Sequence, residues 1–232
     1  MSGLAGRADP GFDQARLQAL FARHASRGTV PADRTLDFGA GGMHVVTVHE
    51  GALLASIELP DDRRQVLCFY WPGDVLFAEL FRPERSVRLR ALRHVAYSGM
   101  TAAEFAAARA ETPEAVPLLL SAALRNLSDL MLHSAAIGRL RSEERLATFF
   151  LELALRTGHA GRDAVTLDFE MRRDDVADYL GLNRDTLSRA MSKLRRDKVL
   201  TFITAGRVVA RLEALSERTP LARAMLMGRS AA

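Results

Sequence analysis

The spacing of hydrophobic residues changes along the chain, from short strand-like runs in the first half to helical periods in the second. Between residues 29 and 98, runs rich in Val, Leu and aromatic residues alternate with clusters of Gly, Pro and Asp. The runs are Thr29–Phe38, Met43–His49, Ala52–Leu59, Arg63–Trp71, Ser86–Leu92 and Val95–Ser98. Evenly spaced short strands with turn residues between them are typical of an antiparallel sandwich or barrel, and we predict one here.

Two short helices are predicted to flank these strands. Phe12–Ala25 carries its apolar residues on one helical face, and Thr101–Ala110 follows the last strand. Thr101 is a good N-cap, and Glu104 stands three residues later, where a capping box needs it. The second helix is therefore predicted to begin directly after Thr101.

A long helix is predicted from Ala115 to about Leu140. Its apolar residues follow an a/d seam that Ser134 interrupts. The seam residues are Leu120, Ala123, Leu127, Leu130 and Ile137. Such a seam can pack on the N-terminal domain of its own chain or on the same helix of a second chain.

A hinge at Arg139–Arg141 is predicted to lead into another helix, with Ser142 as its cap. This helix would bury Leu146, Phe149, Phe150 and Leu153. A loop at Gly158–Gly161 and a short strand at Val165–Phe169 are expected to follow.

The stretch Met171–Leu200 predicts two short helices joined by a tight turn. Gly181 stands at the turn, where a positive φ is needed, and Asn183 is a good N-cap for the second helix. The apolar positions are Val176, Ala177 and Leu180 in the first helix, and Leu187, Met191 and Leu194 in the second. Each helix therefore has one face to bury.

The other face of the second helix belongs to a strongly basic region. Residues 184–211 contain eight basic side chains and two acidic ones, a net charge of +6, whereas the whole chain carries +4. An apolar seam backed by a cationic, hydrogen-bonding face is what a helix needs to enter the major groove of DNA. A merely solvated helix face is the alternative, and the agreement of turn, cap, seam and charge argues against it.

The segment from Arg172 to Asp197 resembles the helix-turn-helix of the Crp/Fnr family of bacterial transcription regulators. The resemblance is carried by Arg184-Asp185-Thr186-Leu187-Ser188-Arg189 in the second helix. Arg184 and Arg189 match the arginines of the family's recognition motif, and Ser188 matches a serine of its Fnr branch. Asp185 departs from the pattern, because the family usually has Glu there.

This resemblance implies a homodimer that binds a palindromic, TTGA-like promoter site on double-stranded DNA and contacts RNA polymerase. The residues expected to contact bases are Arg184, Asp185, Ser188 and Arg189. Those expected to contact phosphates are Arg173, Asn183, Thr186, Lys193 and Arg207. The long helix would then be a parallel dimer helix, placing two recognition helices about 34 Å apart.

A β-hairpin is predicted after the recognition helix, which makes the domain winged. Leu200–Ile203 and Arg207–Leu212 flank the turn Thr204-Ala205-Gly206, and Arg207 would lie near DNA phosphates. Lys198 stands where the family often has a helix-ending Gly, so a positive φ is expected to be strained there.

The strand-rich half resembles the family's jelly-roll sensor domain. The resemblance rests on Glu50-Gly51, on Leu59–Leu67 and on Trp71–Val75, although Asp62 replaces a frequent Gly. We therefore predict an α+β protein with three parts. They are a cyclic-nucleotide-binding-like jelly roll at 1–111, a dimerisation helix at 112–141 and a winged helix-turn-helix domain at 142–232.

Three kinds of effector known in the family leave different marks on a sequence. A cyclic-nucleotide pocket would use Glu79, Arg85 and Ser86, but Ala78 replaces the Gly that lets the backbone approach the ligand. An iron–sulfur cluster needs about four thiolates, and Cys68 is the single cysteine. Haem would need an axial ligand such as His44, His49, His94 or His133, none of which lies in a diagnostic motif. We therefore expect a FixK-like regulator whose small-molecule effector is absent or is one that the sequence does not identify, and no cofactor, with cyclic nucleotide and haem as alternatives.

Other classes of protein fit the sequence less well. A cupin-type enzyme would need clustered metal ligands, whereas His44 and His49 are five residues apart and would point to opposite faces of a strand. No nucleophile elbow, phosphate loop or zinc-protease motif is present, so we expect no enzyme and no metal site. A ligand-binding module that has lost DNA binding would not need Arg184 and Arg189.

The expected location is the cytoplasm. The single cysteine suits a reducing compartment, and the N-terminus lacks an apolar signal core. By the distribution of apolar residues, no run is expected to reach the roughly 20 residues of a membrane span, and no membrane association is expected.

Overall fold

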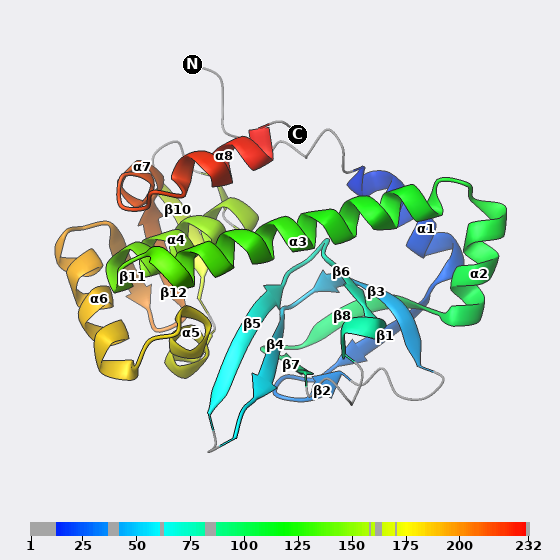
Figure 1. Cartoon of the computed structure of the whole chain (residues 1–232), viewed down its shortest axis with the longest axis horizontal. Coiled ribbons are helices and arrows are strands. Elements are labelled where there is room, and N and C mark those ends of the chain that lie inside the picture. The colour runs from blue at the N-terminus through cyan, green and yellow to red at the C-terminus, as the bar shows by residue number, and fades with distance from the viewer. Residues whose placement is uncertain are drawn as a thin grey trace. The chain divides into compact units, whose positions relative to one another are not determined.

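The computed structural model describes residues 13–36, 42–60, 63–81, 87–157, 159–160, 164–169 and 171–230 (Figure 1). The chain forms two compact units, which divide between Ser128 and Asp129, inside helix α3 (Ala115–Arg139). Phe12, Phe38, Gly39–Gly41, Asp61, Asp62, Arg85, Ser86, Gly158 and Gly161, on which some predictions fall, lie outside the described residues.

The first unit contains the predicted antiparallel sandwich. One sheet has the order β1 (Ser26–Val30), β8 (Val95–Thr101), β3 (Met43–Glu50) and β6 (Val75–Phe77). The other has the order β2 (Thr35–Leu36), β7 (Val87–Ala91), β4 (Leu53–Glu58) and β5 (Arg64–Tyr70). Apolar side chains from both sheets, including Val46, Leu76, Leu53 and Leu89, form one buried core between them. The prediction of a β-sandwich is confirmed.

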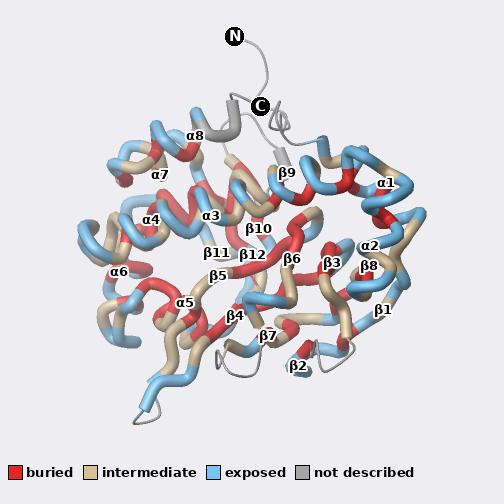
Figure 2. The backbone as a smooth tube through the Cα atoms, turned by 45° about the vertical axis from the view of Figure 1, so that its right-hand side comes forward, coloured by how far each residue is buried: buried red, intermediate tan, exposed pale blue. Residues whose placement is uncertain are grey.

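Three helices cover the first sheet (Figure 1). They are α1 (Gln14–His24), α2 (Ala102–Glu111) and the first half of α3. Their buried residues Leu17, Phe21 and Leu119 pack with Val45 and Met100 of the sheet. The burial colours in Figure 2 show the same division of α1 into a buried and an exposed side. Burial of one apolar face explains why these short helices are stable here.

The capping box at the start of α2 is confirmed. The Thr101 hydroxyl accepts a hydrogen bond from the Glu104 backbone N–H at 3.2 Å, and the Thr101 N–H donates to Glu104 Oε2 at 2.7 Å. The Glu50-Gly51 turn also has a clear cause. Gly51 has φ 84°, and a Cβ there would lie 2.3 Å from the His94 carbonyl oxygen, so only glycine fits.

One strand prediction was wrong, and one strand was missed. Thr29–Phe38 is not one strand, because the chain turns between β1 and β2. Pro31 lacks an N–H for sheet pairing, and Asp33 takes the left-handed φ of 61°. Strand β6, which was not predicted, is only three residues long and continues into a short 3-10 helix, η1 (Ala78–Phe81).

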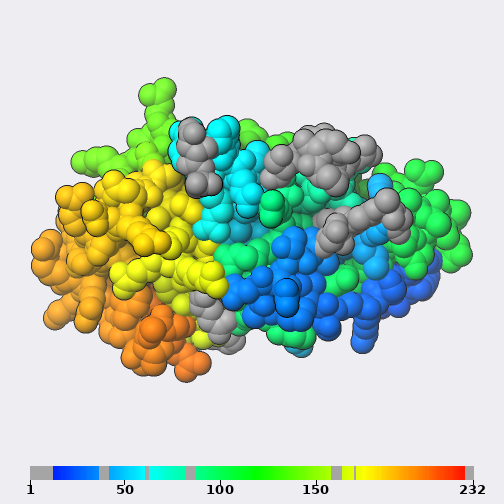
Figure 3. Space-filling model, turned by 90° about the horizontal axis from the view of Figure 1, so that it is seen from below, coloured from blue at the N-terminus to red at the C-terminus, as the bar shows by residue number. Residues whose placement is uncertain are grey.

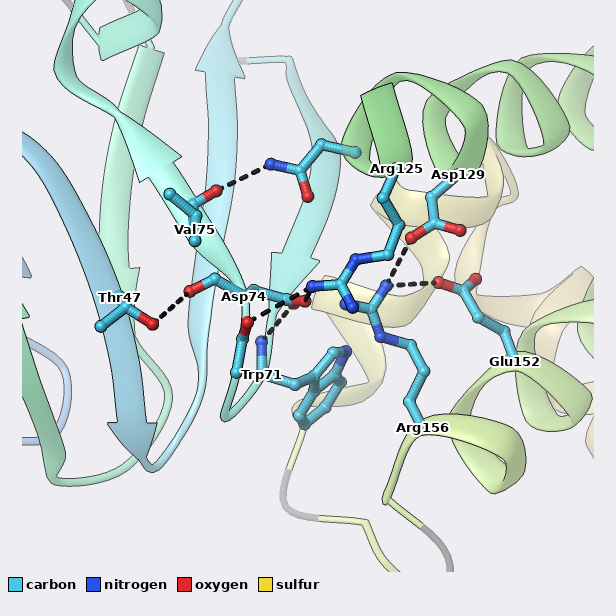
Figure 4. Close-up of polar contacts among 10 residues, drawn as sticks. Thr47, Trp71, Asp74, Val75, Arg125, Asp129, Glu152 and Arg156 are labelled. Carbon is cyan, nitrogen blue, oxygen red and sulfur yellow. Dashed lines mark hydrogen bonds and ion pairs between the residues drawn. The ribbon is translucent and has the colours of Figure 1, made fainter. Parts of the chain in front are cut away.

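Helix α3 is long and apolar enough to cross a membrane by length and composition alone, contrary to the expectation from the sequence. In its first half, however, one side of the helix packs on the sheet. Leu119 and Ala122 are buried on the sheet, and the Asn126 side chain donates to the Val75 carbonyl at 2.7 Å. Arg125 contacts the Asp74 carboxylate at 3.5 Å (Figure 4). Arg125 and Asn126 of α3 thus have polar partners on the sheet of their own unit.

The second unit contains the rest of α3, then α4 (Ser142–Thr157), β9 (His159–Ala160), β10 (Ala164–Asp168), α5 (Arg173–Leu180), α6 (Arg184–Arg196), β11 (Leu200–Thr204), β12 (Arg207–Arg211), α7 (Leu212–Ser216) and α8 (Ala222–Ser230). Its antiparallel sheet has the order β11-β12-β10-β9. The predicted strand at 165–169 and the predicted hairpin are confirmed as β10 and β11–β12.

Helix α4 forms the centre of this unit. It buries Leu146, Phe149, Phe150 and Leu153, as predicted. Ser142 was expected to cap the helix but is its first residue. The Arg141 N–H instead donates to Glu144 Oε2 at 2.8 Å, a contact that satisfies a backbone donor at the helix start. The loop predicted at 158–161 contains β9, which pairs with β10.

Candidate DNA-binding surface

Helices α5 and α6 form the predicted helix-turn-helix. Gly181 ends α5 with φ 60° and ψ 41°, the left-handed conformation that the turn requires. Asn183 then caps α6, because its side-chain oxygen accepts a hydrogen bond from the Thr186 N–H at 2.8 Å. Lys198 has φ 55°, so the expected strain after α6 is present.

The two faces of α6 differ completely. Leu187, Ala190, Met191 and Leu194 are buried. The exposed residues are Arg184, Asp185, Ser188, Arg189, Ser192, Arg195 and Arg196. In Figure 3 the broad yellow to orange area of the molecular surface belongs to the part of the chain that includes α5 and α6. All four residues predicted to contact bases therefore lie together on an open helix face.

The predicted phosphate contacts lie on three elements, α5, α6 with its cap, and β12. Arg173 is exposed at the start of α5, and Arg207 is exposed on β12 of the wing. Asn183 and Thr186 lie at the start of α6, where the Asn183 oxygen is already used by the cap. The Thr186 hydroxyl accepts from Arg189 at 3.4 Å.

A surface hollow of about 540 Å³ lies beside α6. Its lining comes from the start of α4 and from α6: Ser142, Glu143, Thr186, Ser188, Arg189, Ala190, Ser192, Lys193 and Arg196. Hydroxyl groups and cations dominate this lining, which suits an anionic group such as a DNA phosphate. Five of these lining residues were not among the predicted site residues: Ser142, Glu143, Ala190, Ser192 and Arg196. Ser142 and Glu143 are some 50 residues away from α6 in the chain, and only the fold brings them together.

Three of the predicted DNA-contacting cations are paired with carboxylates. Lys193 Nζ lies 2.5 Å from Glu143 Oε2, and Arg207 lies 3.4 Å from Asp168 across the β10–β12 pair. Arg184 pairs with Asp174 of α5. These carboxylates were not among the predicted site residues.

The second half of α3 is fastened to α4 and α5 by polar contacts. Asp129 and Glu152 both pair with Arg156, at 2.9 and 3.6 Å (Figure 4). The His133 ring stacks on Tyr179 of α5, with ring centroids 3.9 Å apart. Burial lowers the pKa of His133 to about 4, so this ring is neutral at neutral pH.

Arg145 adds a connection at the hinge. It donates to the Leu140 carbonyl at 2.8 Å and to the Leu180 carbonyl at 2.9 Å. The end of α3 and the end of α5 thus share one guanidinium group, which supports the turn that precedes the recognition helix.

The residues considered for an effector are not brought together as a pocket by the described part of the chain. Glu79 is exposed on η1, and its proposed partners Arg85 and Ser86 lie outside the described residues. His44 stacks on Phe105, and His49 Nε2 lies 2.6 Å from the Ser98 hydroxyl. Burial, followed by the charge of Arg27, lowers the pKa of His49. Within the described ranges no three His, Cys, Asp or Glu side chains are grouped so that they could hold a metal ion.

Comparisons with known proteins agree with this geometry. Residues 144–218 match the model of the Crp-like helix-turn-helix domain. The chain is 33% identical over 172 residues to nitrogen fixation regulation protein FixK from Bradyrhizobium diazoefficiens, covering 73% of this chain and 72% of that protein.

Solved structures extend the similarity to the rest of the fold. FixK2 from Bradyrhizobium japonicum superposes with a TM-score of 0.72 at 26% identity, covering 84% of this chain and 97% of that one. A cyclic nucleotide-binding domain containing protein from Listeria monocytogenes has a TM-score of 0.68 over 87% of this chain and 99% of that one, and at 14% identity it shows the fold alone. The chain therefore belongs to the Crp/Fnr family of DNA-binding transcription regulators, in its FixK branch.

Proposed function

We propose that this regulator acts as a homodimer in the cytoplasm, binds a palindromic TTGA-like promoter site and contacts RNA polymerase. The exposed face of α6 is the observation that carries the proposal. Arg189 would donate to a guanine edge, and Arg184 to a second base or a phosphate. Asp185 would accept from a base amino group, and Ser188 would contact a neighbouring base. Arg173, Thr186, Lys193 and Arg207 would position the helix on the phosphates.

The exposed apolar residues of α3 support the dimer. In its first part Leu120, Leu124 and Leu127 are 57%, 56% and 51% exposed, and in its second part Met131 is 65% exposed. Leu120, Leu124 and Leu127 are three and four residues apart, so they share one helix face and form an uncovered stripe. Large exposed apolar stripes are unusual in monomers and suit a self-complementary interface. Of the other predicted seam residues, Leu130 is exposed, whereas Ala123 and Ile137 are partly buried.

Binding without a small-molecule effector is also part of the proposal. Ala78 stands where nucleotide-binding relatives have Gly, and its Cβ would crowd a closely approaching ligand. No enzymatic step is proposed, and the similar protein FixK from Bradyrhizobium diazoefficiens is named as a regulation protein.

The test is a fluorescence anisotropy titration on a TTGA-type palindrome and on a scrambled duplex, at fixed salt, with and without cyclic AMP. Tighter binding to the palindrome, unchanged by the nucleotide, is expected. Binding that appears only with cyclic AMP would contradict the proposal that the protein binds DNA without an effector. Equal binding to both duplexes would contradict sequence recognition by α6.

A further inference from the structure

Cations on the DNA-facing side of the second unit are held by carboxylates of the same chain. Lys193 is paired with Glu143, and Arg184 with Asp174, in each case from a different helix. We propose that the carboxylates of Glu143 and Asp174 compete with DNA for these cations. The affinity for DNA is then lower than it would be if the same cations were unpaired. This inference rests on the proposed DNA-binding function of α6.

The Glu143–Lys193 contact is the main evidence for this competition. Glu143 follows Ser142 at the start of α4, and both line the hollow beside α6 together with Thr186, Ser192 and Lys193. Glu143 Oε2 lies 2.5 Å from Lys193 Nζ, and the two side chains are 40% and 44% exposed. A phosphate entering this hollow would meet a negative charge and a lysine whose ammonium group is already neutralised.

Asp174 pairs with Arg184, one of the predicted base-contacting residues at the start of α6. It lies in the first turn of α5, and its carboxylate accepts a hydrogen bond from Arg184 Nη2. Arg184 is 77% exposed, so the pair is accessible to DNA. While this N–H donates to Asp174 it cannot donate to a base edge, so DNA must displace the carboxylate.

The third pair, Arg207 with Asp168, shows the same arrangement on the wing. The two residues stand directly opposite each other on β12 and β10. Residues of α6 therefore form ion pairs with α4 and with α5, and Arg207 of the wing forms a third with β10. One chance contact does not explain three such pairs.

The expected size of the effect follows from the exposure of the pairs. Exposed ion pairs are weak, so releasing one cation should tighten DNA binding by about 1.5- to 5-fold per half-site. In a dimer the effect is squared, giving roughly 2- to 25-fold. Each released cation can also neutralise one more phosphate, so the slope of log K against log salt should steepen by up to about 1.8 for a dimer.

The experiment is an anisotropy titration of full-length protein on the palindrome and on the scrambled duplex at several salt concentrations. Glu143→Gln and Asp174→Asn should each bind both duplexes more tightly than wild type and with a steeper salt dependence. Glu217→Gln is the matched control, because it removes one exposed negative charge from the C-terminal end of α7. Gains no larger than that of the control, or weaker binding, would overturn the proposal. Weaker binding would indicate that the carboxylates orient their cations for DNA.

A double-mutant comparison tests the pairing itself. In a Lys193→Gln background, the gain from Glu143→Gln should shrink to less than half. An undiminished gain would overturn competition for Lys193, because the carboxylate would then act only by repelling DNA. Failure of the proposed function looks different, since wild type itself would then not distinguish the palindrome from the scrambled duplex.

Discussion

Helices α3 and α6 expose opposite kinds of surface. In α6 the apolar residues are buried and the exposed face is charged and hydrogen-bonding. In α3 large apolar residues such as Leu120, Leu124 and Leu127 remain exposed. Water solvates the first face well and the second poorly, because exposed apolar area carries a free-energy cost of about 25 cal/mol per Å². The exposed face of α6 is therefore stable in water and suited to a polyanion, whereas the exposed face of α3 would gain free energy by apolar contact with a second surface, as the proposed dimer requires.

The largest expected effect comes from changing the exposed face of α3. Leu124→Asp combined with Leu127→Asp should convert the dimer to a monomer, because four leucines per dimer would lose about 1.5 kcal/mol or more each, roughly 6 kcal/mol in all. Sedimentation equilibrium should show the mass of one chain, and affinity for the palindrome should fall at least about 100-fold.

Leu80→Asp is the control, because Leu80 is 48% exposed on η1 and outside α3. It should leave the mass and the affinity unchanged. A double variant that remains dimeric would show that α3 is not the interface.

Arg189→Ala tests the polar face of α6. It should cost about 1–3 kcal/mol per half-site, or roughly 2–6 kcal/mol on the palindrome, and relax the preference at one base position. Arg195→Ala removes another exposed cation from the same helix and should weaken palindrome and scrambled duplex alike. If Arg189→Ala bound the palindrome as wild type does, α6 would not enter the groove as proposed.

The pH dependence of stability tests the packing of His133, which lies on the side of α3 that contacts α5. Burial lowers its folded-state pKa to about 4, from 6.5 in the unfolded chain. Between these values the unfolded state binds the extra proton, so the stabilisation by the neutral ring is complete above pH 6.5 and is lost as the pH falls toward 4. The loss amounts to roughly 3 kcal/mol.

His133→Phe keeps an aromatic ring beside Tyr179 and removes the titration. Urea unfolding between pH 4 and 7 should therefore show a shallower pH dependence for this variant than for wild type. Parallel curves for the two proteins would contradict the buried, neutral His133.

The smallest effect is expected at the cap of α6. Asn183→Ala removes the oxygen that accepts from the Thr186 N–H and should lower the free energy of unfolding by about 1 kcal/mol. Asn183→Ser, which can still cap, should lose much less. Equal losses in thermal or urea unfolding would mean that the cap does not contribute through its side-chain oxygen.

Local features of the fold could be predicted from the sequence. Gly181, Asn183 and the Thr101–Glu104 capping box are decided by neighbours within a few residues, and each has the predicted geometry. The buried faces of α4 and α6 were equally predictable, since helical periodicity marks them directly.

Features that depend on distant residues could not be predicted in this way. Strand β6 has only three residues, and its pairing with β3 is what defines it. Glu143 and Lys193 are 50 residues apart, and no sequence pattern connects them. The a/d frame proposed for α3 omitted Leu124 and Met131, because sequence spacing alone does not show which helix face the sheet already covers.

The dependence of affinity on half-site spacing shows whether two α6 helices bind a palindrome through a dimer formed by α3. Anisotropy would compare a palindrome with half-sites one helical turn apart with the same duplex lengthened by about 5 base pairs, half a turn. A two-fold dimer predicts that the insertion reduces affinity to that of a duplex with one half-site. Equal affinity for both spacings would contradict a dimer joined through α3, because it would mean that each chain binds its half-site independently.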